Sequence, residues 1–340
     1  MRREHAGAAN PFLGPEFALA VERRRPGVRV AVLREAGGEP AGFLPYQRGP
    51  LGAGLAVGAG VSDCQGLVHR PGVGWEPERL LRACGLSVLE FDHLVEGGQE
   101  PFEPYVTERF ASPVMDVSKG YEAYENWLRG ESPKFLKTTL AKERRLGRQR
   151  GGVRFVFDER DPRALRALME WKSAQYRRTG RRDRFAQPWI AGLVDDLAAT
   201  RTDGLTGTLS VLYADDDRPI AAHFGLRSES VLACWFPAYD VEFAKYSPGL
   251  ILHLRMAAAA AAEGLGLLDL GRGDAEYKDD LKTGELTVSE ARVLRPSVGA
   301  ALHRLRHDPV RRAHAFVRER PGLAAFARKA LNQAGRLRRA

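Results

Sequence analysis

Residues 245–281 pass from a turn through an apolar helix and a short strand into a polar segment, and this succession restricts the fold strongly. Ser247 and Pro248 predict a helix start, because serine caps helix N-termini and proline is tolerated at the first helical position. The alanine-rich run that follows carries the helix to Gly264, where glycine permits a left-handed end. Residues 265–270 then predict a short apolar strand, so the helix is expected to lie close against a sheet.

The polar segment after this strand holds candidate catalytic residues. Tyr277 and Lys278 bring a phenol and an ammonium group beside a glycine-rich strand end. Asp269 lies at the end of the same strand, and Asp240 follows an earlier one. Carboxylates at strand ends can accept protons, so these two are candidate bases, while the tyrosine is a candidate proton donor. His223, on another expected strand, is a further candidate because imidazole titrates near neutral pH.

Length and cysteine content limit the number of domains and the kinds of site that the chain can have. A chain of 340 residues predicts two domains that share one body. Its three cysteines are widely spaced and form no CxxC, so neither a disulfide framework nor a metal site is expected. The sequence contains no apolar run near the roughly 20 residues that cross a bilayer, and its N-terminus lacks the apolar core of a signal peptide. A cytoplasmic protein is therefore expected.

The net charge of +9 is concentrated at one end of the chain. Residues 295–340 hold 12 Lys and Arg against 2 Asp and Glu, so the remainder is nearly neutral. This basic tail has two equal interpretations: a solvated helix, or a helix that contacts RNA or an anionic membrane at its inner face. DNA is not an expected partner. A second basic segment, 134–150, is interpreted as a solvated helix face.

The same order of elements occurs twice along the chain. The first half predicts a helix at 15–24, a hairpin with its second strand at 40–48, a glycine-rich segment, a helix at 76–84 and a strand at 87–91. Residues 97–113 are expected to be a connector. The second half predicts helices at 121–129, 134–150, 164–178 and 188–199, and then an antiparallel meander at 208–213, 220–227 and 231–239.

This repetition predicts an internal duplication in an α+β, or mixed α/β, protein. The expected units are an N-terminal half at 1–110, a C-terminal half at 111–294 and a basic helical tail at 295–340.

The order of elements and the polar motifs together resemble the acyl-CoA N-acyltransferase (GNAT) superfamily. The motifs are Tyr246-Ser247-Pro248-Gly249 at the helix start, residues 269–273 at the strand end, Tyr277-Lys278 after it, and residues 172–180 (KSAQYRRTG). The likeness is to the CelD-like branch, whose members have two GNAT-type halves and occur with cellulose and exopolysaccharide functions. The chain is also similar to the Fem peptidyl transferases, in which an aromatic-lysine pair follows the corresponding strand.

The resemblance implies two tandem GNAT-type halves and an N-acyltransferase. The expected donor is acetyl-CoA or another acyl-CoA, and the expected acceptor is an amino group on a sugar, a polysaccharide precursor or a small metabolite. By the same resemblance, Lys278 holds the reacting carbonyl. The donor is expected at the helix start, and the substrate at the ends of the meander strands. The implied donor-binding residues are Tyr246, Ser247, Gly249 and Leu250, and the implied substrate-binding residues are Tyr239 and His223.

Two alternatives stay open. Pro248 removes one N–H from the segment that would bind the diphosphate of CoA, and Gly249 is the one glycine in it, so aminoacyl-tRNA, as in a Fem-like aminoacyltransferase, or acyl carrier protein is an alternative donor. A non-catalytic scaffold of an exopolysaccharide assembly is the alternative from another class.

Overall fold

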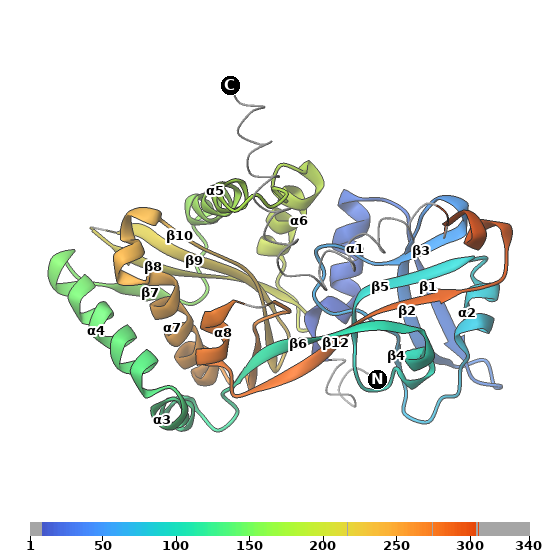
Figure 1. Cartoon of the computed structure of the whole chain (residues 1–340), viewed down its shortest axis with the longest axis horizontal. Coiled ribbons are helices and arrows are strands. Elements are labelled where there is room, and N and C mark those ends of the chain that lie inside the picture. Colours follow the sequence, from blue (N-terminus) through green and yellow to red (C-terminus); the bar gives the residue numbers. More distant parts are fainter. Residues whose placement is uncertain (1–8, 216, 274, 304, 306–340) are drawn as a thin grey trace, which may run out of the picture.

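The computed structural model describes residues 9–215, 217–273, 275–303 and 305. Within these residues, 12 strands form one mixed sheet whose main path runs β1-β2-β3-β5-β12-β6-β11-β10-β9-β8-β7, with β4 paired to β2. Helices cover the sheet, and the two halves of the chain lie side by side along it (Figure 1). The prediction of an α+β fold is confirmed.

The N-terminal half builds one end of the sheet. β1 and β2 form the predicted hairpin, and β3 and β5 pair in parallel with α2 between them in the chain. The elements are η3 (Pro11–Leu13), α1 (Pro15–Arg24), β1 (Val28–Arg34), β2 (Pro40–Arg48), η4 (Pro50–Gly52), β3 (Ala53–Ala56), β4 (Val68–His69), α2 (Pro77–Ala83), β5 (Val88–Val95) and η5 (Glu100–Tyr105).

The C-terminal half builds the other end. The predicted meander is formed by β8, β9 and β10, and the predicted helix before Gly264 is α7. The elements are β6 (Val106–Asp116), α3 (Tyr121–Glu131), α4 (Pro133–Gln149), β7 (Arg154–Val156), α5 (Pro162–Arg178), α6 (Pro188–Ala199), β8 (Thr206–Ala214), β9 (Arg218–Arg227), β10 (Val231–Tyr239), η6 (Val241–Tyr246), α7 (Pro248–Ala262), β11 (Leu267–Asp269), α8 (Glu276–Leu281) and β12 (Gly284–Leu294).

The strand order makes the internal duplication visible. In each half, three antiparallel strands lead through a helix into a parallel strand: β1, β2 and β3 through α2 to β5, and β8, β9 and β10 through α7 to β11. The next strand of each half then crosses to the other half. β6 follows β5 in the chain but pairs with β11, whereas β12 follows α8 but pairs with β5. β6 and β12 pair with each other at the centre, so each half contributes one strand to the sheet of the other.

The expected connector at 97–113 is the main correction. These residues form η5 and the first part of β6, which lies between β11 and β12 in the middle of the sheet. The proline and glutamate content of this segment is unfavourable for a strand, so the sequence did not predict one. The strand forms because it pairs with a neighbour on each side, which outweighs the unfavourable composition. The boundary expected between 110 and 111 lies inside β6, and the one after 294 coincides with the end of β12.

The described start of the basic tail is helical at 298–303. Residue 304 and residues 306–340 lie outside the described residues, and so do the predictions made for them. No helix in the described part of the chain is long and apolar enough to cross a bilayer.

β10 and β11 pair over only three residues each. Val231–Ala233 lies beside Leu267–Asp269, after which β10 continues to Tyr239 while β11 ends. A bulge between Cys234 and Phe236 shifts the register of β10 against β9 at this point. Since a bulge bends its strand, β10 turns away from β11 and the sheet opens between them.

Trp235, in this bulge, connects the two halves. Its indole Nε1 donates a 2.7 Å hydrogen bond to the carbonyl oxygen of Val61 in the N-terminal half. Its ring stacks on Phe236 with 4.6 Å between centroids and meets the edge of Phe12 at 5.2 Å. The N-terminal segment that carries Phe12 is thereby held against the C-terminal meander.

Replacing Trp235 with Ala is expected to lower the free energy of unfolding by about 3–5 kcal/mol, because the variant leaves a cavity between the halves and a carbonyl without its donor. Chemical denaturation followed by circular dichroism measures the change. Val241→Ala, at a side chain that is 56% exposed, is the control and should change stability by less than about 0.5 kcal/mol. Equal effects of the two substitutions would contradict the connecting role of Trp235.

Candidate active site

A cavity of about 250 Å³ lies where β10 and β11 diverge. α5, β10, η6, α7 and α8 all contribute to its walls. Five residues predicted for the site line this cavity: Tyr239, Ser247, Gly249, Leu250 and Tyr277. The predicted donor-binding segment and the predicted Tyr277 therefore face one space.

The start of α7 differs from the sequence prediction in one respect. Ser247 occupies the N-cap position, but its backbone is left-handed (φ 52°) and its side chain caps no backbone N–H. Its Oγ instead accepts a 2.8 Å hydrogen bond from the ammonium group of Lys142 in α4. The N–H of Leu250, to which a capping hydroxyl could bond, donates instead to the backbone carbonyl oxygen of Ser247 at 3.0 Å, so the hydroxyl is available to α4.

Basic residues from α4 and η6 surround this helix start. Lys142 is one of them. The guanidinium of Arg145 lies 5.9 Å from the ring centroid of Tyr246, and the ammonium of Lys245 lies 4.9 Å from the same centroid. The basic segment 134–150, expected to be a solvated helix face, thus places at least one ammonium at the mouth of the cavity. An anionic group bound there would be attracted by these charges and by the helix dipole.

Three aromatic side chains form a row beside the cavity. The rings of His223 and His253 are 6.0 Å apart, and those of His253 and Tyr277 are 5.4 Å apart. Nδ1 of His253 lies 2.6 Å from the carbonyl oxygen of Gly249. Burial lowers the pKa of both histidines and raises the pKa of Tyr277 to about 12, so all three are neutral at pH 7.

His223 is bonded to the bulge in β10. Its Nε2 accepts a hydrogen bond from the backbone N–H of Trp235 at 3.2 Å, which assigns the ring proton to Nδ1 in the neutral imidazole. That Nδ1 is buried and has no hydrogen-bond partner in the described part of the chain. A buried donor of this kind is costly unless a ligand satisfies it.

Asp269 and Lys278 lie next to each other at the junction of the halves. Asp269 accepts hydrogen bonds from the hydroxyl of Ser112 at 2.7 Å, the N–H of Gly271 at 3.0 Å and the amide of Asn10 at 3.3 Å. The ammonium of Lys278 donates to the carbonyl oxygen of Gly271 at 2.7 Å. Burial raises the pKa of the Asp269 carboxyl, while the hydrogen bonds and the charge of Lys278 oppose that shift. Because it accepts three hydrogen bonds, this carboxylate holds the strand end in place and is less suited to act as a base.

The carboxyl group better suited to accept a proton is Asp63, which the sequence did not single out. It comes from the loop after β3 in the N-terminal half, and burial raises its pKa to about 6. The charges of His93, Arg184, Asp269 and Lys278 also act on it, and Nε2 of His93 lies 3.9 Å away. Its side chain is 23% exposed. A carboxylate tuned close to neutral pH is typical of a general base.

Two residues of the KSAQYRRTG segment also reach the site. Lys172 in α5 donates to the carbonyl oxygen of Pro237 in β10 at 2.9 Å, and burial lowers its pKa to about 8. Gln175, one turn further, lines the cavity with a buried Oε1 that has no hydrogen-bond partner among the described residues. The sequence marked this segment as a family motif without assigning it a role.

Five predicted residues do not line the cavity: His223, Asp269 and Lys278, described above, and Asp240 and Tyr246. Asp240 caps η6 by accepting from the N–H of Glu242 and forms an ion pair with Arg218. Tyr246 is buried under α4, where its hydroxyl donates to Oε1 of Gln149 at 2.8 Å. Both therefore support the loop before α7 and do not face the cavity.

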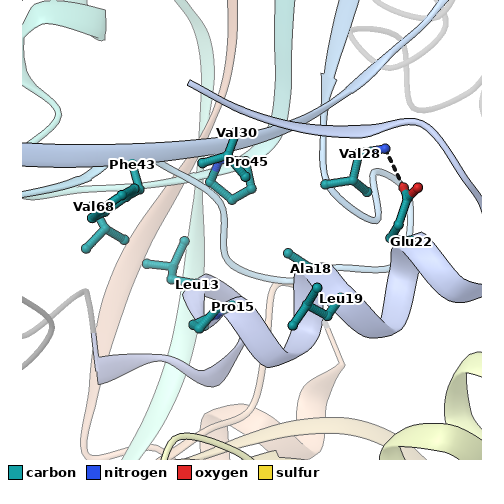
Figure 2. A pocket seen from close by; sticks show the side chains of 11 residues that line it. Leu13, Pro15, Ala18, Leu19, Glu22, Val28, Val30, Phe43, Pro45 and Val68 are labelled. Atoms are coloured by element: carbon teal, nitrogen blue, oxygen red, sulfur yellow. Dashed lines mark hydrogen bonds between the residues drawn. The ribbon is translucent and has the colours of Figure 1, made fainter. Parts of the chain in front are cut away.

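A larger hollow exists in the N-terminal half. It has a volume of about 630 Å³ and lies between α1 and the strands β1 and β2 (Figure 2). Its walls are almost entirely apolar, and it holds none of the predicted site residues. The polar groups that acyl transfer requires converge instead at the opening between β10 and β11.

Comparison with known proteins agrees with this geometry. Residues 134–279 match the model of the acetyltransferase (GNAT) domain. The fold is shared with FemX at a TM-score of 0.54 and 12% identity, over 85% of this chain and 92% of that one. It is also shared with L-PGS from Bacillus licheniformis at a TM-score of 0.52 and 10% identity, over 85% of this chain and 94% of that one.

A third structure with this fold is the C-terminal domain of a putative lysylphosphatidylglycerol synthetase from Agrobacterium fabrum, with a TM-score of 0.51 and 13% identity over 85% of this chain and 90% of that one. No curated protein matches by sequence. The domain match makes residues 134–279 similar to a GNAT domain, and the chain as a whole shares the fold of FemX.

Asp63→Asn is expected to slow acyl transfer by about 10²–10⁴-fold at pH 7.5, because it removes a proton acceptor. The ratio of wild-type to variant kcat/KM should rise with pH through about 6, where Asp63 ionises, and stay constant above it. Using this ratio cancels the ionisation of the amine substrate. Asp217→Asn, at a side chain that is 72% exposed, is the charge control.

The same variant tests the pKa through stability. The folded-state pKa of Asp63 is above the ordinary value, so ionisation destabilises the fold above about pH 6 and this loss is recovered as the pH falls. Asp63→Asn should therefore raise Tm at pH 7.5 and leave it unchanged near pH 3. A variant with a lower Tm and unchanged activity would rule out the role of base.

Proposed function

We propose that this protein transfers an acyl group, with acetyl as the first choice, from acyl-CoA to the amino group of a sugar, a polysaccharide precursor or another small amine. The observation that carries the proposal is the cavity between β10 and α7, which has a basic mouth at Ser247 and is lined on another side by Tyr277, the residue before Lys278. The thioester would enter along β10, with the acyl group directed at the junction of the halves.

Basic side chains from α4 support a CoA donor. Pro248 removes an N–H at the helix start, but Lys142 places an ammonium 2.8 Å from the Ser247 hydroxyl. A charged donor to phosphate is stronger than a neutral N–H, so this lysine can replace the missing group. The buried, unpartnered Oε1 of Gln175 offers an acceptor to an amide N–H, such as those in the pantetheine arm.

The proposed reaction is a direct transfer. The neutral amine attacks the thioester carbonyl, the new C–N bond forms, and Asp63 takes the proton that the nitrogen loses. The C–S bond then breaks, and the thiolate leaves as CoA after it takes a proton from Tyr277 or solvent. Lys278, whose charge acts on Asp269, would stabilise the oxyanion that forms between these steps, as fixed cations do in other acyl transfers.

An aminoacyl donor is the second candidate, favoured by the fold shared with FemX. The exposed arginines of α4, such as Arg144 and Arg148, would then contact tRNA, and binding would weaken steeply with salt. Activity that survives complete ribonuclease treatment of the donor would contradict this alternative. We place either reaction in the cytoplasm, with residues 295–340 as the contact to an anionic membrane or RNA.

Lys142→Ala tests the donor. Loss of a charge-assisted hydrogen bond is expected to raise KM for acetyl-CoA by about 10- to 100-fold. Acetyl transfer from the thioester of N-acetylcysteamine, which has no phosphate, should be unaffected. Lys137→Ala, an exposed lysine on the same helix, is the matched control. Equal losses with both donors would contradict a phosphate contact, and failure of wild-type protein to release thiol with any amine would contradict the function itself.

Lys278→Met tests the oxyanion role while it preserves much of the buried volume. We expect kcat to fall by about 10²–10³-fold with little change in the KM for the thioester, because the lost interaction is formed in the transition state. Steady-state kinetics and thermal denaturation should be measured together. A variant that unfolds, or that changes KM alone, would indicate that Lys278 supports the Gly271 turn and does not stabilise the reacting carbonyl.

A further inference from the structure

Strand β5 contains a bulge beside the loop that carries Asp63. The register of β12 against β5 shifts between Ser289 and Ala291. At this shift, Asp92 and His93 of β5 lie opposite a single residue of β12. In a regular strand two successive side chains point to opposite faces of the sheet, whereas a bulge re-aims them. Here Nδ1 of His93 and Oδ2 of Asp92 come within 3.6 Å of each other. Bulges that redirect a side chain are common beside active sites.

Gln65, two residues after Asp63, completes the hydrogen bonding of this bulge. Its Oε1 accepts from the backbone N–H groups of Asp92 at 3.0 Å and His93 at 3.2 Å, and its Nε2 donates to Oδ1 of Asp92. Oδ2 of Asp92 accepts a further hydrogen bond of 2.9 Å from the N–H of Gly60, which belongs to the same loop as Gln65. Because both of its oxygens have donors, the Asp92 carboxylate is a fixed negative charge on one side of His93.

The ring of His93 lies between two carboxylates. Its Nε2 is 3.9 Å from Oδ1 of Asp63, and its Nδ1 is 3.6 Å from Oδ2 of Asp92. Both distances are longer than a hydrogen bond, and the buried Nδ1 has no hydrogen-bond partner in the described part of the chain. His93 therefore acts on its neighbours through charge, because charges interact over such distances and an imidazolium attracts both carboxylates.

His93 has the largest effect among the charges that act on Asp63. Burial raises the pKa of the Asp63 carboxyl to about 6, and the charge of His93 opposes this rise more than the charges of Arg184 and Lys278 do. Arg184 comes from the segment between α5 and α6, and Lys278 from α8. Asp269, at the end of β11, acts in the same direction as burial. Burial, with a smaller contribution from Asp63, raises the pKa values of other titratable neighbours, which are Tyr176 in α5, Cys64 beside Asp63 and Cys234 in β10.

Asp92 and Asp63 are left in different states by this arrangement. Burial alone would raise the pKa of the Asp92 carboxyl, but the charge of His93 and the hydrogen bonds from Gln65 and Gly60 hold it below its usual value. Asp92 is thus ionised at pH 7, whereas Asp63 titrates near pH 6. A permanent negative charge on one side of His93 favours the imidazolium, and the imidazolium favours the ionised form of Asp63 on the other side.

We propose that His93, held by Asp92, is a positioning residue that keeps the Asp63 carboxylate ionised and ready to take the proton of the attacking amine; this rests on the proposed function. His93 contacts no reacting atom in this role and acts through Asp63. The proton that the amine nitrogen loses still ends on Asp63, so the balance of the proposed transfer is unchanged. The bulge in β5 aims the imidazole at the base.

The test follows the ionisation of Asp63 in the full chain. For each background, kcat/KM is divided by that of the same background with Asp63→Asn, and the pH at which this ratio reaches half its maximum is the midpoint. His93→Gln should move the midpoint from about 6 to about 7, because a positive neighbour is lost, and activity should be retained at high pH. Glu96→Gln, at a 53% exposed side chain directly after β5, is the charge control and should leave the midpoint in place.

Asp92→Asn separates the two routes by which this charge can act, and its side chain is 35% exposed, so the variant should fold. Direct loss of a nearby negative charge would lower the midpoint, whereas loss of the charge that favours the imidazolium raises it. We expect the midpoint to rise, and not to rise further when Asp92→Asn is added to His93→Gln. A fall in the midpoint, or an equal rise in both backgrounds, would overturn the inference.

Thermal denaturation gives a readout that needs no turnover. The folded-state pKa of Asp63 lies above its ordinary value, so its ionisation costs stability above about pH 6, and loss of His93 raises that pKa further. The gain in Tm from Asp63→Asn at pH 7.5 should therefore be larger in the His93→Gln background than in the wild type. An equal gain together with an unmoved midpoint overturns the inference while the proposed function stands. A larger gain in a protein that transfers an acyl group to no amine contradicts the proposed function, and the inference with it.

Discussion

The pairing of β6 with β12 is the constraint on which the rest of this structure depends. β6 follows β5 of the N-terminal half in the chain but also pairs with β11 of the C-terminal half. β12 follows α8 of the C-terminal half but also pairs with β5 of the N-terminal half. The two halves therefore share one sheet. This continuity fixes the loop that carries Asp63 against the strand end that carries Asp269. The proposed site, with Asp63 as its base from one half and its donor cavity from the other, needs such a rigid junction, because small displacements of reacting groups are costly in rate.

The junction between the halves also explains the shifted pKa values of the buried charged residues. Asp63, Asp269, Lys172 and Lys278 act on one another across the halves, and burial shifts three of their pKa values toward neutrality. Shifts of this kind cost stability in the resting protein and are useful where protons must move at pH 7. Trp235, Phe12 and Phe17 form an apolar cluster beside these groups, which provides the packing that holds them there.

The sequence predicted the C-terminal half well, since its elements depend on local signals. α7 begins at Pro248 and ends before Gly264 as expected, and the meander before it is formed, although Ser247 does not cap the helix. β6 was missed because a strand paired on both sides tolerates residues that look like a connector. Asp63 was missed for a different reason: its raised pKa comes from burial and from charges distant in sequence, which no local pattern encodes. Tyr246 and Asp240 were placed in the correct loop, but which way a side chain faces depends on packing.

The exchanged strand has a consequence for how the protein is made. β5 ends at Val95, but its neighbour β12 begins at Gly284, so the N-terminal sheet remains incomplete until almost 200 further residues have left the ribosome. Contacts this distant in sequence slow folding, and an unpaired strand edge invites wrong partners in the meantime. A nascent chain cut short before β12 would therefore contain the whole GNAT-matched segment and still lack the closed sheet, so synthesis itself delays the joining of the two halves until β12 has been made.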